Sequence, residues 1–473
     1  MWLRLIGGLL CASLSVGIHA NPLQSGGKTS TDKSGGNAFS MPASNLSFDK
    51  RLEFSVGNSF FRNPWVTAPA TTDARDGLGP LFNTNTCQGC HIKDGRGHPP
   101  RFKGDNAVSM LVRLSIPAEN TALAQSHSEH QPGLAAHFLT QQGVVPEPHY
   151  GGQLQDMAIP GAKPEGKANI SYQRQTLRLN DGGQVELRKP QLELTDLNYG
   201  PLHPDTLFSA RIAQPMIGLG LLEAIPEAVL LAREDAADHN KDGISGRANR
   251  VWDHKAGKTL VGRFGWKAGQ PSLRQQNASA FAGDMGLTSA LFLSDDCMPA
   301  QDCGRFPNGG KLEVSEAILD SVTFYSQHLA VPLRRGLDKP EVKAGEQLFL
   351  ALGCSACHTP AYTTGQHSSP ALSGQKIYPY TDLLLHDMGE GLADNRPEFL
   401  ANGREWRTQP LWGLGYAAEV AGAEDAFYLH DGRARTLLEA ILWHGGEAES
   451  AKQRVLAASN TERAQLIAFL ESL

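Results

Sequence analysis

Two strings, CQGCH at residues 87–91 and CSACH at residues 354–358, decide how this chain is interpreted. Each has the form C-x-x-C-H, which is the attachment string of c-type haem. Its spacing lets two thiols form thioethers with the vinyl groups on one porphyrin edge. The histidine that follows then lies under the ring and ligates the iron. We therefore expect two covalently bound c-type haems, held by Cys87, Cys90 and His91 and by Cys354, Cys357 and His358.

Other uses of paired cysteines fit these strings less well. A redox-active C-x-x-C needs no histidine after it. A zinc ribbon has its two pairs about 15–20 residues apart, whereas these pairs lie in opposite halves of the chain. Cys297 and Cys303 enclose a short polar loop without a histidine, and we expect a local disulfide there. Two free thiols are the alternative.

The first 20 residues have the features of a secretory signal peptide. Arg4 precedes an apolar stretch, residues 5–18, and Ala20 is the small residue expected at a cleavage site. A short buried helix is the alternative, and lipidation of Cys11 is disfavoured because Leu10 precedes it. Export predicts a periplasmic protein. Residues 21–45 are rich in Gly, Ser, Thr and Lys, and we expect a flexible leader there.

Composition and charge exclude several classes of protein. The 473 residues are 40% hydrophobic and 19% charged, which excludes wholesale disorder. The net charge of −6 lacks the basic character of a nucleic-acid-binding protein. No apolar run reaches the ~18 residues of a membrane span. The 50 Gly and 28 Pro residues predict a fold rich in turns.

The pattern along the chain predicts a mainly α protein with two cytochrome c-like haem domains, residues 46–332 and 333–473. Residues 170–195 alternate around Asp181-Gly182-Gly183, which predicts a β-hairpin inside a large insertion in the first domain. An amphipathic pattern at residues 313–330 closes that domain. A helix at residues 342–352 leads into the second C-x-x-C-H string, and another helix ends the chain.

Longer stretches around the two strings carry a family resemblance. They include QPMIGLGLLEAIPE at 214–227, GRFGWKAGQPSL at 262–273, LLLHDMGEGLAD at 383–394 and LHDGRARTLLEAILWHGGEA at 429–448. The chain resembles the di-haem cytochrome c peroxidase superfamily, and within it the di-haem oxidoreductase branch, whose members also carry the label thiol oxidoreductase. The thiol label finds no support here, because haem takes four cysteines and the expected disulfide takes two.

The resemblance implies two cytochrome c-like domains that face each other. The C-terminal haem would take electrons from a small soluble donor, a cytochrome c or a cupredoxin. It would pass them to the N-terminal haem, which reacts with hydrogen peroxide. Related enzymes often dimerise, so a homodimer is also implied.

The second axial ligand of the C-terminal haem is expected at His444. The resemblance aligns it with a position where peroxidases typically carry Met, and imidazole in place of thioether lowers the reduction potential. His386 and Met388 are rivals for this role, and a capping histidine at a helix end is the structural alternative. For the N-terminal haem no ligand stands out among the candidates, which are His98, His127, His130, His137 and His149. An open coordination position there is therefore expected.

The resemblance also implies a glutamine and an acidic residue near the reactive iron. Gln153 is the candidate for the glutamine, and Glu165 is a fallback for the acid, because Arg211 lies near where the family's Glu is expected. Trp266 is a candidate electron relay between or beside the haems, with a buried core Trp as the alternative. We expect His430 to be structural, and Arg433 and Arg435 to pair with haem propionates.

Asp238, Asn240 and Asp242, followed by Gly243, match positions 1, 3, 5 and 6 of an EF-hand loop. Position 12 is Asn249 in place of the bidentate Glu, so the match is partial. A calcium site and a simple polar turn both fit this pattern.

Three functions remain open at this point. The first is a periplasmic di-haem peroxidase-like enzyme, which the family pattern favours. The second is a non-enzymatic di-haem electron carrier, which His444 and the missing Glu favour. The third is an oxidase or oxygenase acting on an organic or protein substrate, for which the insertion would shape a site.

Overall fold

The computed structural model describes residues 22–102, 104–118, 134–422 and 426–473. The predicted signal peptide, His127 and His130 lie outside these residues. The α-helices are α1 (Phe48–Arg62), α2 (Cys87–Cys90), α4 (Leu134–Gln141), α5 (Leu219–Glu223), α6 (Glu227–Leu231), α7 (Leu273–Met285), α8 (Glu316–Gln327), α9 (Pro340–Ala351), α10 (Ala417–Ala421), α11 (Leu437–Leu442), α12 (Glu449–Ala457) and α13 (Asn460–Ser472). The strands are β1 (Leu81–Phe82), β2 (Met110–Ser115), β3 (Met157–Ala158), β4 (Lys167–Arg178), β5 (Gln184–Thr195), β6 (Leu207–Ile212), β7 (Arg250–Asp253), β8 (Lys258–Val261), β9 (Tyr362–Thr363), β10 (Lys376–Ile377), β11 (Leu385–Asp387) and β12 (Glu405–Arg407).

The expectation of a mainly α protein is wrong. The structure is 31% helical and 18% strand. Its strands pair in antiparallel twos, β1 with β3, β2 with β6, β4 with β5, β7 with β8, β9 with β10 and β11 with β12. The physical reason lies in the many glycines and prolines, which break the chain into short segments. Such segments satisfy their backbone hydrogen bonds as small ladders and turns.

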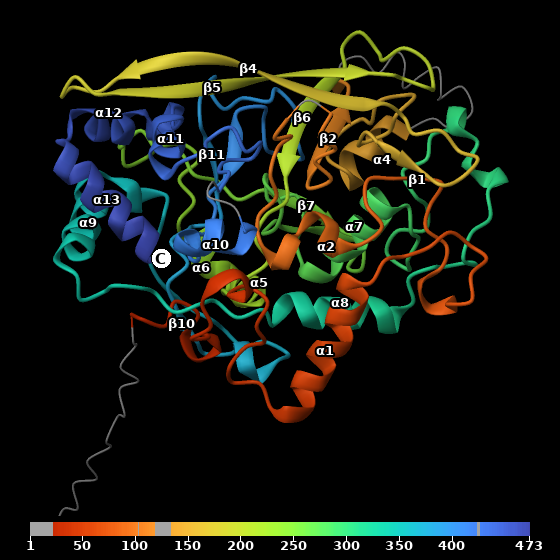
Figure 1. Cartoon of the computed structure of the whole chain (residues 1–473), viewed down its shortest axis with the longest axis horizontal. Helices are drawn as coiled ribbons and strands as arrows, with labels where there is room; N and C mark the ends of the chain where they lie inside the picture. The colour runs from red at the N-terminus through yellow and green to blue at the C-terminus, as the bar shows by residue number, and fades with distance from the viewer. Residues whose placement is uncertain (1–21, 103, 119–133, 423–425) are drawn as a thin grey trace, which may run out of the picture.

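The hairpin of β4 and β5 forms where the alternating sequence predicts it. Its strands pair from Lys167 opposite Thr195 to Arg178 opposite Gln184. It runs along one edge of the molecule, over both the N-terminal and the C-terminal halves of the chain (Figure 1). Arg188 donates from Nε to the carbonyl of Arg433 at 2.8 Å and from Nη2 to that of Gly432 at 3.1 Å. The insertion therefore ties the first half of the chain to the second.

Helices α1, α7 and α8 build the core of the N-terminal half. Phe54 and Phe61 of α1 pack against Tyr325 of α8, with ring centroids 4.6 and 5.0 Å apart. Gly57 permits this crossing, because a Cβ there would collide with the carbonyl of Ser321 on α8. The predicted closing helix is thus present as α8, and it supports the segment that carries the first C-x-x-C-H string.

In the C-terminal half, α9 packs against α13, the last helix of the chain. Phe349 of α9, Tyr380 and Phe469 of α13 form an aromatic cluster, with ring centroids 5.2–5.7 Å apart. Helix α9 ends at Ala351, just before the 3-10 turn Cys354–Ala356. Both predicted helices are therefore present, and they hold the second string between them.

The segment expected to be a flexible leader is packed against the rest of the protein. Ala38 and Phe39 are buried, and Phe39 lies in one apolar cluster with Tyr416. The Thr31 amide donates to the carbonyl of Val331 at 3.1 Å, and the Ala43 amide donates to that of His328 at 2.8 Å. The few apolar side chains among many polar ones are what anchor this segment.

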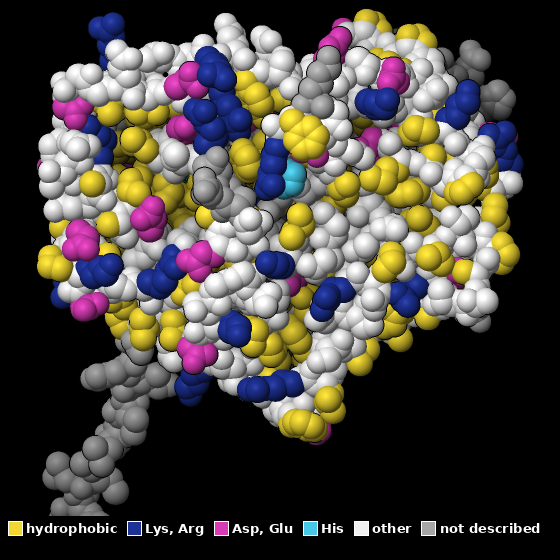
Figure 2. All heavy atoms as spheres, in the orientation of Figure 1, with side chains coloured by type: hydrophobic (Ala, Val, Ile, Leu, Met, Phe, Trp, Pro, Cys, Tyr) yellow, Lys and Arg dark blue, Asp and Glu magenta, His cyan; other side chains and the backbone are white. Residues whose placement is uncertain are grey.

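The surface in Figure 2 carries Lys and Arg side chains interspersed with Asp, Glu and apolar side chains. This mixture agrees with the modest net charge of −6. None of the described helices combines the length and the apolar character needed to cross a lipid bilayer.

Candidate functional site

The first C-x-x-C-H string forms the short helix α2, which Thr86 caps by accepting a hydrogen bond from the Gly89 amide at 3.3 Å. His91 follows the helix, and its Nδ1 donates to the carbonyl of Gln214 at 2.7 Å. That bond fixes the tautomer and leaves Nε2 unprotonated. Burial lowers the pKa of His91 to about 4, so the ring is neutral. A neutral imidazole with an available Nε2 is what an iron ligand requires.

The second string repeats this arrangement in a 3-10 turn. Nδ1 of His358 donates to the carbonyl of Tyr380 at 2.9 Å. Burial, with a smaller contribution from the nearby His444, lowers the pKa of His358 to about 4. Nδ1 of His444 donates to the carbonyl of Ala440 at 2.7 Å. Two neutral imidazoles, each with Nε2 available, therefore lie close enough to interact, and this pair fits a haem iron with both axial positions filled.

The rivals of His444 are placed differently. Nδ1 of His386 contacts Glu447 at 2.7 Å and Nε2 contacts Asp382 at 2.9 Å. Burial alone would lower the pKa of His386, but these two carboxylates raise it well above its usual value. A protonated imidazole with both nitrogens engaged is not a metal ligand. Met388 packs against the apolar cluster around Trp443.

A cavity of about 640 Å³ opens beside the first string. Its wall includes Cys87, Cys90 and His91, so it meets the edge where a porphyrin would attach. The volume lies in the usual range for cofactor and ligand pockets. Strand β2 with the residue before it, and much of helix α7, form a large part of the wall; these lining residues include Ser109, Leu111, Arg113, Leu273, Gln276, Asn277, Ala280 and Asp284.

Asp284, at the end of α7, is an acidic group in this cavity that the sequence analysis missed. Its Oδ1 accepts a hydrogen bond from Nε2 of Gln153 at 3.0 Å. Burial raises the pKa of Asp284, against the opposing charge of Arg113. Asp284 also raises the pKa of the Cys87 thiol electrostatically, after the larger effect of burial. A carboxyl group whose pKa is raised by burial therefore lies within electrostatic range of the attachment cysteines.

Gln153 is buried behind this wall and is not among the residues that line the cavity. Its Nε2 lies 2.6 Å from Oδ1 of Asn83, as well as 3.0 Å from Asp284. The glutamine implied by the resemblance thus holds an acid in place, and its side chain does not face the cavity.

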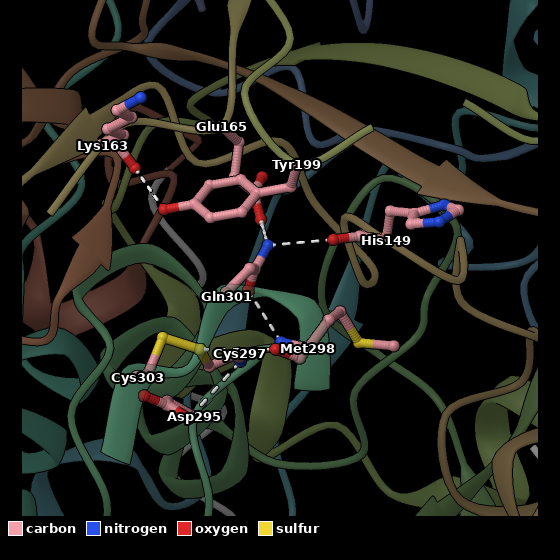
Figure 3. Close-up of a disulfide and its surroundings, with 9 residues drawn as sticks. All are labelled: His149, Lys163, Glu165, Tyr199, Asp295, Cys297, Met298, Gln301 and Cys303. Atoms are coloured by element: carbon pink, nitrogen blue, oxygen red, sulfur yellow. Dashed lines mark hydrogen bonds between the residues drawn. A yellow bond between two sulfur atoms is a disulfide. The ribbon is translucent and has the colours of Figure 1, made fainter. Parts of the chain in front are cut away.

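Glu165 lies in a layer outside the cavity wall, next to the Cys297–Cys303 pair (Figure 3). Its carboxylate accepts hydrogen bonds from the backbone amide of Gln155, at 2.5 Å, and from the side chain of Gln301. Burial raises the pKa of Glu165 well above its usual value. The structure therefore does not bring Glu165 together with the first C-x-x-C-H string.

The sulfur atoms of Cys297 and Cys303 lie at bonding distance, with their Cα atoms 6.4 Å apart, as the loop spacing predicts. Gln301 inside this loop accepts a hydrogen bond from the Met298 amide at 2.7 Å (Figure 3). Asp295 and Asp296 just before the loop line the cavity. The disulfide loop therefore supports one part of the cavity wall.

Trp266 lines the cavity, and its Nε1 donates to the carbonyl of Ile212 at 2.9 Å. Its ring meets His430 edge-on at 6.4 Å, and His430 stacks on Trp406 at 3.7 Å. Burial lowers the pKa of His430 to about 4. Trp266 is thus one end of a row of three aromatic rings that starts at the cavity.

Of the histidines considered for the first site, His137 lines the cavity, as does His254. Nδ1 of His98 donates to the carbonyl of Pro99 at 2.9 Å, and its ring packs near Phe427. The backbone of His149 accepts a hydrogen bond from Gln301 (Figure 3). His98 and His149 are not among the lining residues.

Arg433 is already paired, because its guanidinium donates to Asp431 at 2.6 and 2.9 Å and also to the carbonyl of Gly391. Arg435 pairs with Glu439 at 3.0 Å. Arg407, which the sequence analysis missed, lines the cavity, and burial lowers its pKa to about 9. Arg407 is therefore better placed than Arg433 to meet an acidic group in the cavity.

The acidic side chains of the EF-hand-like loop accept hydrogen bonds from backbone amides of the same loop. Asp238 accepts from the Gly243 amide at 3.2 Å, and Asp242 accepts from the Ile244 amide at 2.9 Å. Asn249 points elsewhere, donating to the carbonyl of Lys267 at 2.8 Å. Among the described residues, the one convergent group of His, Cys and acidic side chains is Asp295, Cys297 and Cys303, whose sulfurs are bonded to each other. Calcium binding by Asp238, Asn240 and Asp242 stays a prediction.

Comparisons with known proteins identify the family to which the chain belongs. None of the curated proteins gives a match. Among solved structures, a chain of hydrazine synthase from Kuenenia stuttgartiensis, pressurised with 20 bar xenon, is 15% identical, with a TM-score of 0.30 over 56% of this chain and 73% of that chain. So weak a likeness supports no inference. The family model described as "di-haem oxidoreductase, putative peroxidase" matches residues 19–473. The chain therefore belongs to the di-haem oxidoreductase family.

Proposed function

We propose that this protein is a periplasmic, peroxidase-like enzyme with two covalently attached c-type haems. The first would be held by Cys87, Cys90 and His91, and the second by Cys354, Cys357, His358 and His444. The net reaction is H₂O₂ + 2 e⁻ + 2 H⁺ → 2 H₂O. A small soluble donor protein would supply the electrons through the second site.

The observation that carries this proposal is the difference between the two sites. His91 faces a cavity of about 640 Å³ that holds protonatable carboxyl groups. His358 has His444 beside it as a second neutral imidazole. An iron with a free position reduces peroxide, whereas an iron with two imidazole ligands transfers electrons with little rearrangement. This asymmetry supports a role for the first site in reducing peroxide and for the second site in supplying electrons.

The side chains around the first site would orient the axial histidine and supply a proton to the peroxide. Nδ1 of His91 donates to the Gln214 carbonyl, and this bond would hold the ring so that Nε2 is available to bind the haem iron. Asp284 would supply a proton to the oxygen that leaves as water, because burial favours its protonated form. Gln153 is a positioning residue, since it donates to Asp284 at 3.0 Å.

Two spectroscopic measurements on the oxidised protein test the proposal. The pyridine haemochrome spectrum should show two haems per chain, both with thioether links. Electron paramagnetic resonance should show one low-spin centre with two imidazole ligands and one high-spin centre. A His444→Ala variant should lose the low-spin signal and keep the high-spin one. Two low-spin signals in the unmodified protein, both resistant to added azide, would reject the open first site.

A further inference from the structure

Strand β2 forms part of the cavity wall and runs away from the attachment cysteines of the first site. Sγ of Cys90 lies 3.1 Å from the carbonyl of Val108, just before the strand begins. Ser109, Leu111 and Arg113 then line the cavity at every second position, as the alternation of a strand requires. At roughly 3.3 Å per residue, Arg113 lies on the order of 16 Å along the strand from Val108. The backbone of Arg113 therefore lies well away from the attachment thiols, at a second end of the cavity.

Two guanidinium groups at this second end have N–H donors without a hydrogen-bond acceptor. The side chain of Arg113 makes no hydrogen bond and no ion pair within the part of the chain that the structure describes. Arg211 pairs with Leu111 across the sheet and is 9% exposed. Its Nη1 donates to Glu398 at 2.7 Å and its Nε to Ser209 at 2.9 Å. Its buried Nη2 has a carboxylate oxygen of Asp394 3.8 Å away but makes no hydrogen bond.

The charges at this end add up to an excess of positive charge. Arg396 donates to the same Oε2 of Glu398 as Arg211, at 3.2 Å. The other nearby carboxylate, Asp394, is shared between Lys267 at 2.9 Å and Arg211 at 3.8 Å, so the cations outnumber these two carboxylates. Although burial opposes it, Arg211 and Arg396 hold the pKa of Glu398 down to about 2. Buried donors without acceptors are costly and therefore point to a missing acceptor.

Asp296 is a carboxylate of the chain that could compete for Arg113. It lines the same cavity, and Arg113 lowers its pKa electrostatically. The larger effect is burial, which raises the pKa of Asp296 and favours its neutral form. The two side chains make no ion pair with each other.

We infer that Arg113 and Nη2 of Arg211 form a carboxylate-binding site at the end of the cavity remote from Cys87 and Cys90. Guanidinium groups bind carboxylates through paired, charge-assisted hydrogen bonds. Leu111 and Phe399 line the same cavity and suit the carbon skeleton of an organic acid. Such a carboxylate has two possible sources, a free organic acid or a propionate of the haem bound in this cavity.

Benzoate is the probe for a free acid. It is titrated calorimetrically into the oxidised holoprotein, without peroxide or reductant, so the outcome does not depend on the proposed peroxidase activity. Arg113→Gln should weaken benzoate binding about tenfold or more, which is the effect of losing one charge-assisted hydrogen bond. Arg174→Gln, on the hairpin surface with its side chain 74% exposed, removes the same charge and should leave binding unchanged.

The midpoint potential of the first site distinguishes the other source. If a propionate occupies the Arg113 site, benzoate does not bind, and Arg113→Gln lowers the potential, because a positive charge near the iron is lost. Arg113→Lys, which keeps the charge, should restore the potential, and Arg174→Gln should not change it. The inference is overturned if Arg113→Gln alters neither quantity in a holoprotein with normal haem content, or if Arg174→Gln alters them equally.

Discussion

Asp284→Asn separates the chemical role of the cavity acid from its structural role. The carboxyl oxygen of Asp284 accepts a hydrogen bond from Nε2 of Gln153 at 3.0 Å, and an Asn side chain offers an oxygen at the same place. Burial already favours the neutral form of Asp284, so a neutral amide costs little in electrostatic energy. We expect the free energy of unfolding to change by less than about 1 kcal/mol.

The rate of peroxide reduction should respond very differently. A positioned general acid contributes about 10²–10⁴-fold, which is about 3–5 kcal/mol of activation free energy. Because burial raises the pKa of Asp284, its protonated form persists to higher pH than an ordinary carboxyl group. The wild-type rate should therefore fall as the pH rises through this raised pKa. Asp284→Asn should lose both the rate and that part of the pH profile.

The assay is stopped-flow absorbance of the half-reduced protein mixed with hydrogen peroxide between pH 4 and 9. Asp302→Asn is the matched control, since Asp302 is exposed and its positive φ of 48° suits Asn. Gln153→Leu should lower the rate less than Asp284→Asn, because it frees the acid without removing it. A rate in Asp284→Asn within threefold of wild type, with the same pH profile, would refute the assignment of Asp284 as the acid.

Three further predictions concern the second site, the hairpin and the arginine cluster. His444→Met should raise the midpoint potential of the second site, because thioether ligation gives a higher potential than imidazole ligation. Spectroelectrochemistry measures this potential, and an unchanged value would show that His444 does not bind the iron. Arg188→Ala should lower the free energy of unfolding, measured by urea titration, by about 2–4 kcal/mol, because two hydrogen bonds to carbonyls of the C-terminal half are lost. Arg174→Ala, at an exposed position, is the control and should have little effect. The pKa of Glu398 is about 2 in the folded protein and 4.5 in the unfolded chain, so ionised Glu398 stabilises the folded protein at pH values above 4.5. This contribution, on the order of 3 kcal/mol, disappears as the pH falls towards about 2. Glu398→Gln should be less stable than wild type at pH 7 and should lose that part of the acid dependence; an unchanged pH profile would contradict the role of Glu398.

What the sequence predicts well depends on residues that are close together along the chain. The C-x-x-C-H strings and their histidines are complete within five residues, and the hairpin is set by alternation around Asp181-Gly182-Gly183. The helices that flank the second string also follow from local periodicity. The sequence could not show that the hairpin spans both halves of the molecule, since the carbonyls that bind Arg188 belong to Gly432 and Arg433.

The candidate site was harder to predict because its wall is assembled from distant segments. Asp284 lies in the last turn of a helix with no acidic pattern to mark it, and it lines the cavity through the packing of α7 against α8 and β1. Glu165, the fallback acid, is drawn into the layer around the disulfide loop by Gln155 and Gln301. The overall class was also misjudged, because resemblance to cytochromes suggests helices while glycine and proline shorten them into turns and small ladders.

The most direct test of the account is the optical spectrum of the half-reduced protein before and after one equivalent of hydrogen peroxide. The account predicts rapid oxidation of the second site, held by His358 and His444, with peroxide consumed at the first site beside His91. An unchanged spectrum over minutes, in protein with two haems per chain, would contradict it. Both irons would then be shielded, and an electron carrier without peroxidase activity would describe the molecule better.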